Sequence, residues 1–115
     1  MKTRELNEEF EREIDEIGRQ IKEKYKPEKI ILFGSLIKGK ITEDSDIDML
    51  IIKDTNKRRN ERFREVRAIV RDLKRRIPFS PLVYTPGEIE QRLNLGDFFI
   101  KEILKEGRVL YESKR

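Results

Sequence analysis

Residues 30–53 read IILFGSLIKGKITEDSDIDMLIIK and contain most of the chemistry that the chain suggests. An apolar run rich in β-branched side chains, residues 29–33, ends at Gly34, and a second run, residues 47–53, begins after a polar loop. Short runs of this kind are typical of strands that are covered on both faces. The stretch therefore predicts two strands joined by a polar loop.

Two carboxylates, Asp46 and Asp48, stand at the start of the second run. Because side chains alternate along a strand, both are expected on the same side, with α-carbons about 6.5 to 7 Å apart. Carboxylates are costly beside an apolar strand unless a cation or hydrogen-bond donors compensate their charge. The chain has no histidine and no cysteine, so a metal would be held by carboxylates, which favours Mg²⁺ or Mn²⁺.

Gly34 and Ser35 suit a phosphate group. Gly34 lets a ligand approach the backbone, while Ser35 adds a hydroxyl and an amide where a short helix would begin. Taken alone, such a pair more often marks a simple turn. If the two strands are antiparallel neighbours, however, the turn and the carboxylates lie side by side. That arrangement favours a site for a nucleoside triphosphate and its metal ion.

The rest of the chain predicts more helices and strands around this pair. Pro81 favours an edge position or a bulge in the third strand, and Thr85 with Glu88 forms a capping-box pattern. We expect an α+β fold of two layers, with a small mixed, largely antiparallel sheet flanked by helices, in one domain over residues 1–115. The further elements are expected over residues 2–25, 57–76 and 85–106 (helices, the last broken near Gly96) and over residues 78–84 and 108–111 (strands).

Composition limits the partners. Charged residues make up 43% of the chain with both signs interleaved, so the net charge of +4 is weak evidence for nucleic-acid binding. Residues 53–76 are more basic, with eleven Lys or Arg against four Asp or Glu. They form either a binding face for RNA or an acidic partner, or a solvated helix face. No run reaches the roughly 18 to 20 apolar residues of a membrane span, so we expect a cytoplasmic protein, with a composition typical of heat-loving organisms.

The motif Gly34-Ser35, ten residues, then Asp46-Ile47-Asp48 resembles the signature of the minimal nucleotidyltransferases (MNT) of the DNA polymerase β superfamily. The resemblance covers roughly residues 10–111 and implies that superfamily's palm-like fold. It implies that Asp46 and Asp48 are catalytic and bind Mg²⁺ or Mn²⁺.

The same resemblance implies a nucleotide-binding set, in which Ser35 holds the triphosphate and Lys38 assists the phosphates where the family often has arginine. The full set is Gly34, Ser35, Lys38 and Ser45.

One position departs from the family pattern. Catalysing members usually carry a third carboxylate on the third strand, and the matching residue here is Ser80. Either another acid (Glu43, Asp44 or Glu88) takes its place, or the chain binds nucleotide and transfers it poorly.

The resemblance implies transfer of a nucleotidyl group from ATP or a similar triphosphate to an acceptor hydroxyl. It also suggests the acceptor, a tyrosine of a HEPN-type partner in a toxin–antitoxin pair. The alternative is a non-catalytic nucleotide-binding antitoxin that acts by contact, and a third hypothesis is RNA binding through residues 57–76. The sequence leaves open the base, the acceptor and whether the chain forms homo-oligomers.

Overall fold

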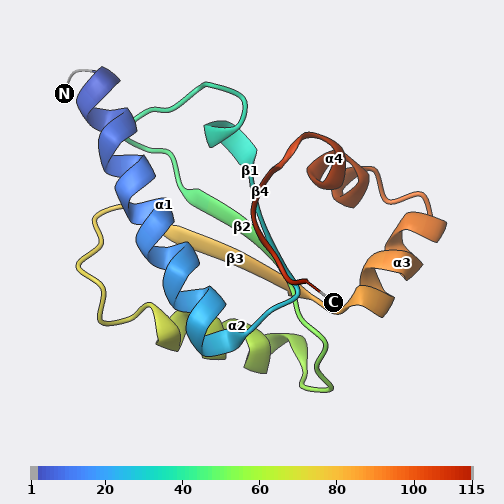
Figure 1. Cartoon of the computed structure of the whole chain (residues 1–115). Coiled ribbons are helices and arrows are strands. Elements are labelled where there is room, and N and C mark those ends of the chain that lie inside the picture. Colours follow the sequence, from blue (N-terminus) through green and yellow to red (C-terminus); the bar gives the residue numbers. More distant parts are fainter. Residues whose placement is uncertain (1–2, 115) are drawn as a thin grey trace.

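The computed structural model describes residues 3–114, with side chains from Glu5 onward. The expected start of the first helix at Lys2 lies outside the described residues. Four strands form one mixed sheet flanked by helices, which confirms the α+β fold. The elements, in chain order, are α1 (Thr3–Tyr25), β1 (Lys29–Phe33), the 3-10 helix η1 (Gly34–Leu36), β2 (Ile47–Ile52), α2 (Arg59–Ile69), β3 (Phe79–Tyr84), α3 (Pro86–Asn94), α4 (Phe98–Glu106) and β4 (Arg108–Glu112) (Figure 1).

The strands lie in the order β3-β2-β1-β4. The central strand β1 is antiparallel to β2 and β4, whereas β2 and β3 are parallel. The strand that contains Pro81 is at an edge, as predicted, because proline has no N–H to give to a second neighbour.

The sheet separates two apolar clusters, because alternate residues of each strand face opposite sides. On one face, Ile30, Met49 and Phe79 pack with the buried stripes of α1 and α2. On the other face, Ile31 and Leu50 pack with side chains of α3 and α4. Figure 1 shows α3 and α4 grouped together, apart from α1 and α2.

The predicted helix over residues 57–76 is wrong in its length. The helix ends at Ile69, and Val70 leaves the helical region with φ −100° and ψ 5°. The buried Glu13 carboxylate of α1 accepts hydrogen bonds from the backbone N–H groups of Arg76 and Ile77, at 3.1 Å each. This contact holds the segment before β3 in a non-helical form, so tertiary structure overrides the helical periodicity.

The break near Gly96 and the capping box are both confirmed. Gly96 has φ +77°, a conformation that separates α3 from α4. The Thr85 hydroxyl accepts from the Glu88 N–H at 3.1 Å, and the Glu88 carboxylate accepts from the Thr85 N–H at 2.8 Å.

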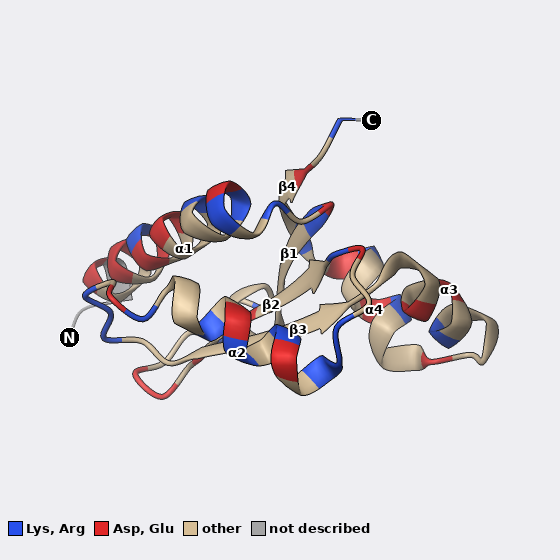
Figure 2. Cartoon of the chain, turned by 90° about the horizontal axis from the view of Figure 1, so that it is seen from below, with Lys and Arg blue, Asp and Glu red and all other residues tan. Residues whose placement is uncertain are grey.

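Charged residues of both signs lie along α1 and α2 (Figure 2). Such a mixture gives the surface no single dominant sign over these helices. Within residues 3–114, no helix combines the length and the apolar character that a membrane crossing requires.

Arg62 of α2 is buried and joins three elements. Its guanidinium and Nε donate to the carbonyl of Val83 in β3 (3.3 Å), to the carbonyl of Lys57 (2.7 Å) and to the carboxylate of Glu88 in α3 (2.7 Å). A buried charge is tolerated because nearby acceptors satisfy it. This residue therefore fixes α2 and α3 against the same end of β3.

We predict that Arg62→Met lowers the free energy of unfolding by about 2 kcal/mol, because it leaves the Glu88 carboxylate without its charged donor. Urea denaturation measures the change. Arg64→Met is the matched control, since Arg64 is exposed on the same helix and its replacement should change stability by less than about 0.5 kcal/mol. Equal losses for the two variants would contradict the role given to Arg62.

Candidate functional site

The candidate site lies where β1 ends and β2 begins. These strands are antiparallel neighbours, and Phe33 lies opposite Asp48 in their register. Gly34 follows Phe33 with φ +86°, a region that residues with a side chain rarely adopt. A Cβ built on Gly34 would overlap Oδ2 of Asp48 and lie 3.2 Å from its Cγ. Glycine is therefore required here both for the backbone conformation and for the close approach of the carboxylate.

Asp46 and Asp48 form the acidic part of this site. Both are half-buried. Burial and the neighbouring Asp46 carboxylate raise the pKa of Asp48 above its usual value. The pair thus has an unfavourable charge that a divalent cation would relieve, which fits the donor set of Mg²⁺ or Mn²⁺.

The described residues provide no group of three or more His, Cys, Asp or Glu side chains arranged to hold a metal ion. A cation held by Asp46 and Asp48 would take its remaining oxygen ligands from water or from substrate phosphates, as Mg²⁺ commonly does. The carboxylate pair therefore fits a metal that arrives with a nucleotide better than a permanently caged one.

Ser80 stands where the resemblance predicts a third carboxylate. Asp48 pairs with Ser80 across the parallel strands β2 and β3. By strand alternation both side chains lie on the face that α3 and α4 cover further along the sheet. The residue beside Asp48 thus has a hydroxyl, where the nucleotidyltransferases that the motif resembles usually have an acid.

Two of the acids considered as replacements, Glu43 and Asp44, are exposed in the loop before β2. Glu88 lies beyond the opposite end of β3 and hydrogen-bonds to Arg62 and to the Thr85 amide. Although partial burial acts in the other direction, these hydrogen bonds hold the pKa of Glu88 below its usual value. Glu88 therefore has a structural partner and does not face Asp48.

Ser45, a predicted nucleotide ligand, is buried and closes the loop. Its hydroxyl oxygen accepts from the Thr42 N–H at 2.9 Å. Its role toward a nucleotide stays a prediction, as do those of Ser35 and Asp46, which do not line the cavity described next.

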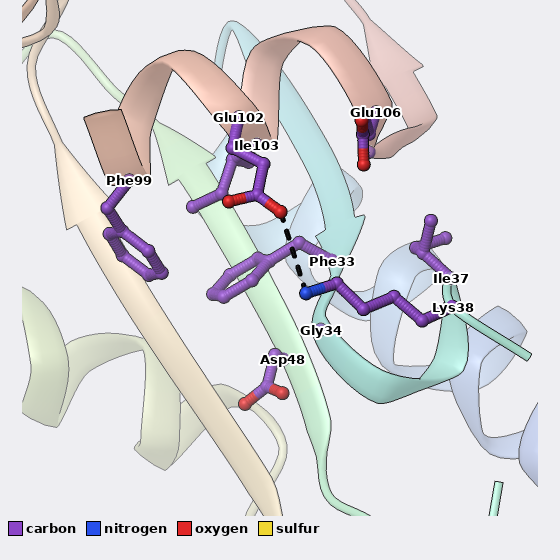
Figure 3. A pocket seen from close by; sticks show the side chains of 10 residues that line it. Phe33, Gly34, Ile37, Lys38, Asp48, Phe99, Glu102, Ile103 and Glu106 are labelled. Carbon is purple, nitrogen blue, oxygen red and sulfur yellow. Dashed lines mark ion pairs between the residues drawn. The ribbon is translucent and has the colours of Figure 1, made fainter. Parts of the chain in front are cut away.

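A cavity of about 320 Å³ adjoins the Asp48 carboxylate (Figure 3). It brings together three predicted residues, Gly34, Lys38 and Asp48, and it extends beneath α4. Lys38 Nζ lies 3.5 Å from a carboxylate oxygen of Glu102 on α4. The remaining lining residues are Phe33, Ile37, Phe99, Glu102, Ile103, Glu106 and Gly107.

Sequence reasoning missed the contribution of α4. Phe99 and Ile103 share one face of the helix by their spacing, and the sequence pattern indicates only apolar packing for this face. The acids Glu102 and Glu106 beside that stripe were the available signal. No local sequence pattern shows that Phe99 and Ile103 line the same cavity as Asp48.

Comparisons with known proteins find similar sequences over most of the chain. The family model described as polymerase beta, nucleotidyltransferase, matches residues 15–115. A protein of Methanocaldococcus jannaschii named "Putative protein adenylyltransferase MJ0604" is 36% identical over 105 residues, which cover 88% of this chain and 97% of that protein. A second protein of that organism, MJ1305, has the same description and is 37% identical over 81 residues, or 66% of this chain and 55% of its own length.

We predict that Asp48→Asn raises the melting temperature of the metal-free protein at pH 7. The substitution removes a carboxylate whose burial and proximity to Asp46 disfavour its charge. Because the folded-state pKa is raised, the advantage should shrink as the pH falls toward the usual aspartate value of about 3.9. Scanning calorimetry in the presence of a chelator measures both effects, with Asp44→Asn as the exposed control. A lower melting temperature for Asp48→Asn at pH 7 would show that the charge of Asp48 does not destabilise the metal-free protein.

Gly34→Ala should cost more stability than Gly39→Ala. Both glycines have positive φ, +86° and +71°, so each alanine carries a backbone penalty of about 1 kcal/mol. Only at Gly34 would the new Cβ also meet Asp48, whereas nothing lies within 4 Å of one at Gly39. Urea denaturation compares the two variants, and equal losses would show that the close approach to Asp48 is unimportant.

Proposed function

The chain belongs to the polymerase β nucleotidyltransferase family, as a minimal nucleotidyltransferase, and from that membership we propose that it transfers a nucleotidyl group from ATP to a hydroxyl of a partner protein. The observation that carries the proposal is the approach of the Gly34 backbone to the Asp48 carboxylate across β1 and β2. It supports a phosphate site and a metal site within reach of one triphosphate.

The binding roles are divided between the turn and the carboxylates. The backbone amides at Gly34 and Ser35, the Ser35 hydroxyl and the Lys38 ammonium are donors for phosphate oxygens. Asp46 and Asp48 would hold Mg²⁺ or Mn²⁺. When bound, the cation would neutralise charge on the triphosphate and activate the acceptor oxygen.

In the transfer step, the acceptor oxygen forms a bond to the α-phosphorus. The bond from that phosphorus to the α–β bridging oxygen breaks, pyrophosphate leaves, and the acceptor hydroxyl loses its proton. Ser80 stands beside Asp48, and a neutral hydroxyl does not accept this proton as a carboxylate would. The proton therefore passes to solvent, and we expect slow transfer.

The proposed acceptor is a tyrosine of a HEPN-type partner in a toxin–antitoxin pair. The names of the relatives describe those proteins as protein adenylyltransferases, which supports a protein acceptor. The side chains of Leu95 and Phe98, at the corner between α3 and α4, are 77% and 75% exposed. Exposed apolar side chains that gather at one place commonly mark a surface that another protein covers.

A second candidate function is a nucleotide-binding antitoxin that neutralises its partner by contact without transfer. The hydroxyl of Ser80 beside Asp48 favours it.

RNA binding through residues 57–76 has less support. Arg62, Arg67 and Arg75 donate to backbone carbonyls of the chain itself, at 2.7 to 3.3 Å. These guanidinium groups are partly engaged in holding α2 and the segment after it to β3, and fewer donors remain for phosphates.

We predict that Ser80→Asp raises the rate of nucleotidyl transfer by about 100-fold, because it supplies a carboxylate beside Asp48. Transfer is followed from α-labelled ATP with Mg²⁺ to the protein encoded beside this chain. Ser80→Asn, of similar size but without charge, is the matched control and should not accelerate transfer. If wild type and Ser80→Asp both fail to label the partner, and Asp46→Asn still neutralises it, the non-catalytic function is correct instead.

A further inference from the structure

We propose that a groove between α2 and the outer edge of β3 is a docking site for an acidic segment of a partner protein, one in which carboxylates flank a large apolar side chain. The groove has a volume of about 680 Å³ and is lined by Arg59, Asn60, Phe63 and Arg64 of α2 and by residues 81–84 of β3. None of these residues lines the cavity next to Asp48. The inference therefore does not depend on nucleotidyl transfer.

The outer edge of β3 disfavours the addition of another strand. Within the described sheet, β2 is the one strand beside β3. On the other side, Arg67 donates to the Phe79 carbonyl at 2.9 Å, and Arg62 donates to the Val83 carbonyl at 3.3 Å. Between these two residues, Pro81 has no N–H to donate. Because the backbone edge is blocked in this way, a partner in the groove must be held by side chains.

Apolar side chains form the floor of the groove. Pro81 and Val83 are buried and Leu82 is half-buried, whereas the Phe63 ring is 44% exposed. An apolar side chain that meets this ring would be favoured, because both surfaces leave water. The groove follows β3 over residues 81–84, or roughly 10 Å. That length suits one large apolar side chain and its immediate neighbours.

Two arginines give the groove its charge preference. Arg59 precedes Phe63 by about one helical turn, and Arg64 follows it directly. No acidic residue lines the groove, and among the described residues no ion pair includes either arginine. Guanidinium groups form strong paired hydrogen bonds with carboxylates. The groove therefore favours a ligand with carboxylates on both sides of its apolar residue.

An acidic peptide fits the groove better than single-stranded RNA. Bases stack on open aromatic faces, but guanidinium groups already lie over both rings of the groove. The Arg59 guanidinium carbon is 4.7 Å from the centroid of the buried Tyr84 ring. That of Arg67 is 5.6 Å from the centroid of the Phe63 ring. A guanidinium over a ring keeps the N–H groups in its own plane for a carboxylate.

NMR titration of the ¹⁵N-labelled chain tests the proposal with three ligands. The first is a blocked peptide in which a leucine stands between two pairs of glutamates, the second has alanine in place of the leucine, and the third is a short oligouridine. We expect the leucine peptide to shift the amide resonances of residues 59–64 and 82–84. It should bind about tenfold more tightly than the alanine peptide, because its larger side chain buries more apolar area.

Variants separate the apolar contact from the charges. Phe63→Ala should weaken binding of the leucine peptide by about tenfold and change that of the alanine peptide little. Arg59→Gln combined with Arg64→Gln should weaken both peptides by about tenfold. The three side chains are exposed, so we expect the variants to fold, and their NMR spectra without peptide show whether they do.

The controls lie outside the groove. Val109→Ala removes an apolar group that is 49% exposed on β4, and Arg19→Gln combined with Arg71→Gln removes the same charge from exposed positions. Both controls should bind the peptides as the wild type does.

Three results would overturn the docking site. The first is an absence of shifts with the leucine peptide. The second is equal binding of the two peptides, or an equal loss in the arginine variant and its control, which would reduce the effect to general attraction by positive charge. The third is an oligouridine that binds more tightly than the leucine peptide and shifts the same resonances, which would make the groove an RNA site. Because no nucleoside triphosphate is present, each result leaves the proposed transfer activity to its own test.

Discussion

The antiparallel pairing of β1 with β2 is the constraint on which the site depends. It sets Phe33 opposite Asp48 and brings Gly34 against the Asp48 carboxylate. A slip of one residue would turn Asp48 toward the cluster of α1 and α2, where its neighbours in sequence, Ile47 and Met49, are fully buried. An ionised carboxylate there would lack any partner. The buried cluster therefore enforces the register that assembles the site.

The face of the sheet that bears Asp48 is packed against α4 at one end and borders a cavity at the other. Further along β2, Leu50 packs with Ile100 and Ile103 of α4, whereas Asp48 adjoins the cavity. Gly107 allows α4 to end close above β1, since a Cβ there would overlap Ile31 and the Ile103 carbonyl. Close packing at one end of α4 thus fixes this helix above β1, where its side chains line the cavity next to Asp48. The charge of Asp48 lowers the stability of the fold, and binding of a cation at this carboxylate would offset that loss.

Local patterns predicted much of the fold. The bounds of β1, the edge position of β3, the break at Gly96 and the cap formed by Thr85 with Glu88 each follow from a few neighbouring residues. The end of α2 could not be predicted this way, because it depends on a contact between Arg76 and Glu13, 63 residues apart. The α4 wall of the cavity was missed for the same physical reason. Its side chains meet β1 only through the tertiary fold, and no local periodicity records that.

Titration calorimetry of ATP with Mg²⁺ against the wild type and Asp48→Asn tests the nucleotide site most directly. With the proposed site, ATP binds the wild type only when Mg²⁺ is present, and Asp48→Asn loses that metal-dependent binding while it remains folded. Binding of equal affinity to both proteins, with or without Mg²⁺, would show that the carboxylates at the start of β2 do not hold the metal of a bound nucleotide.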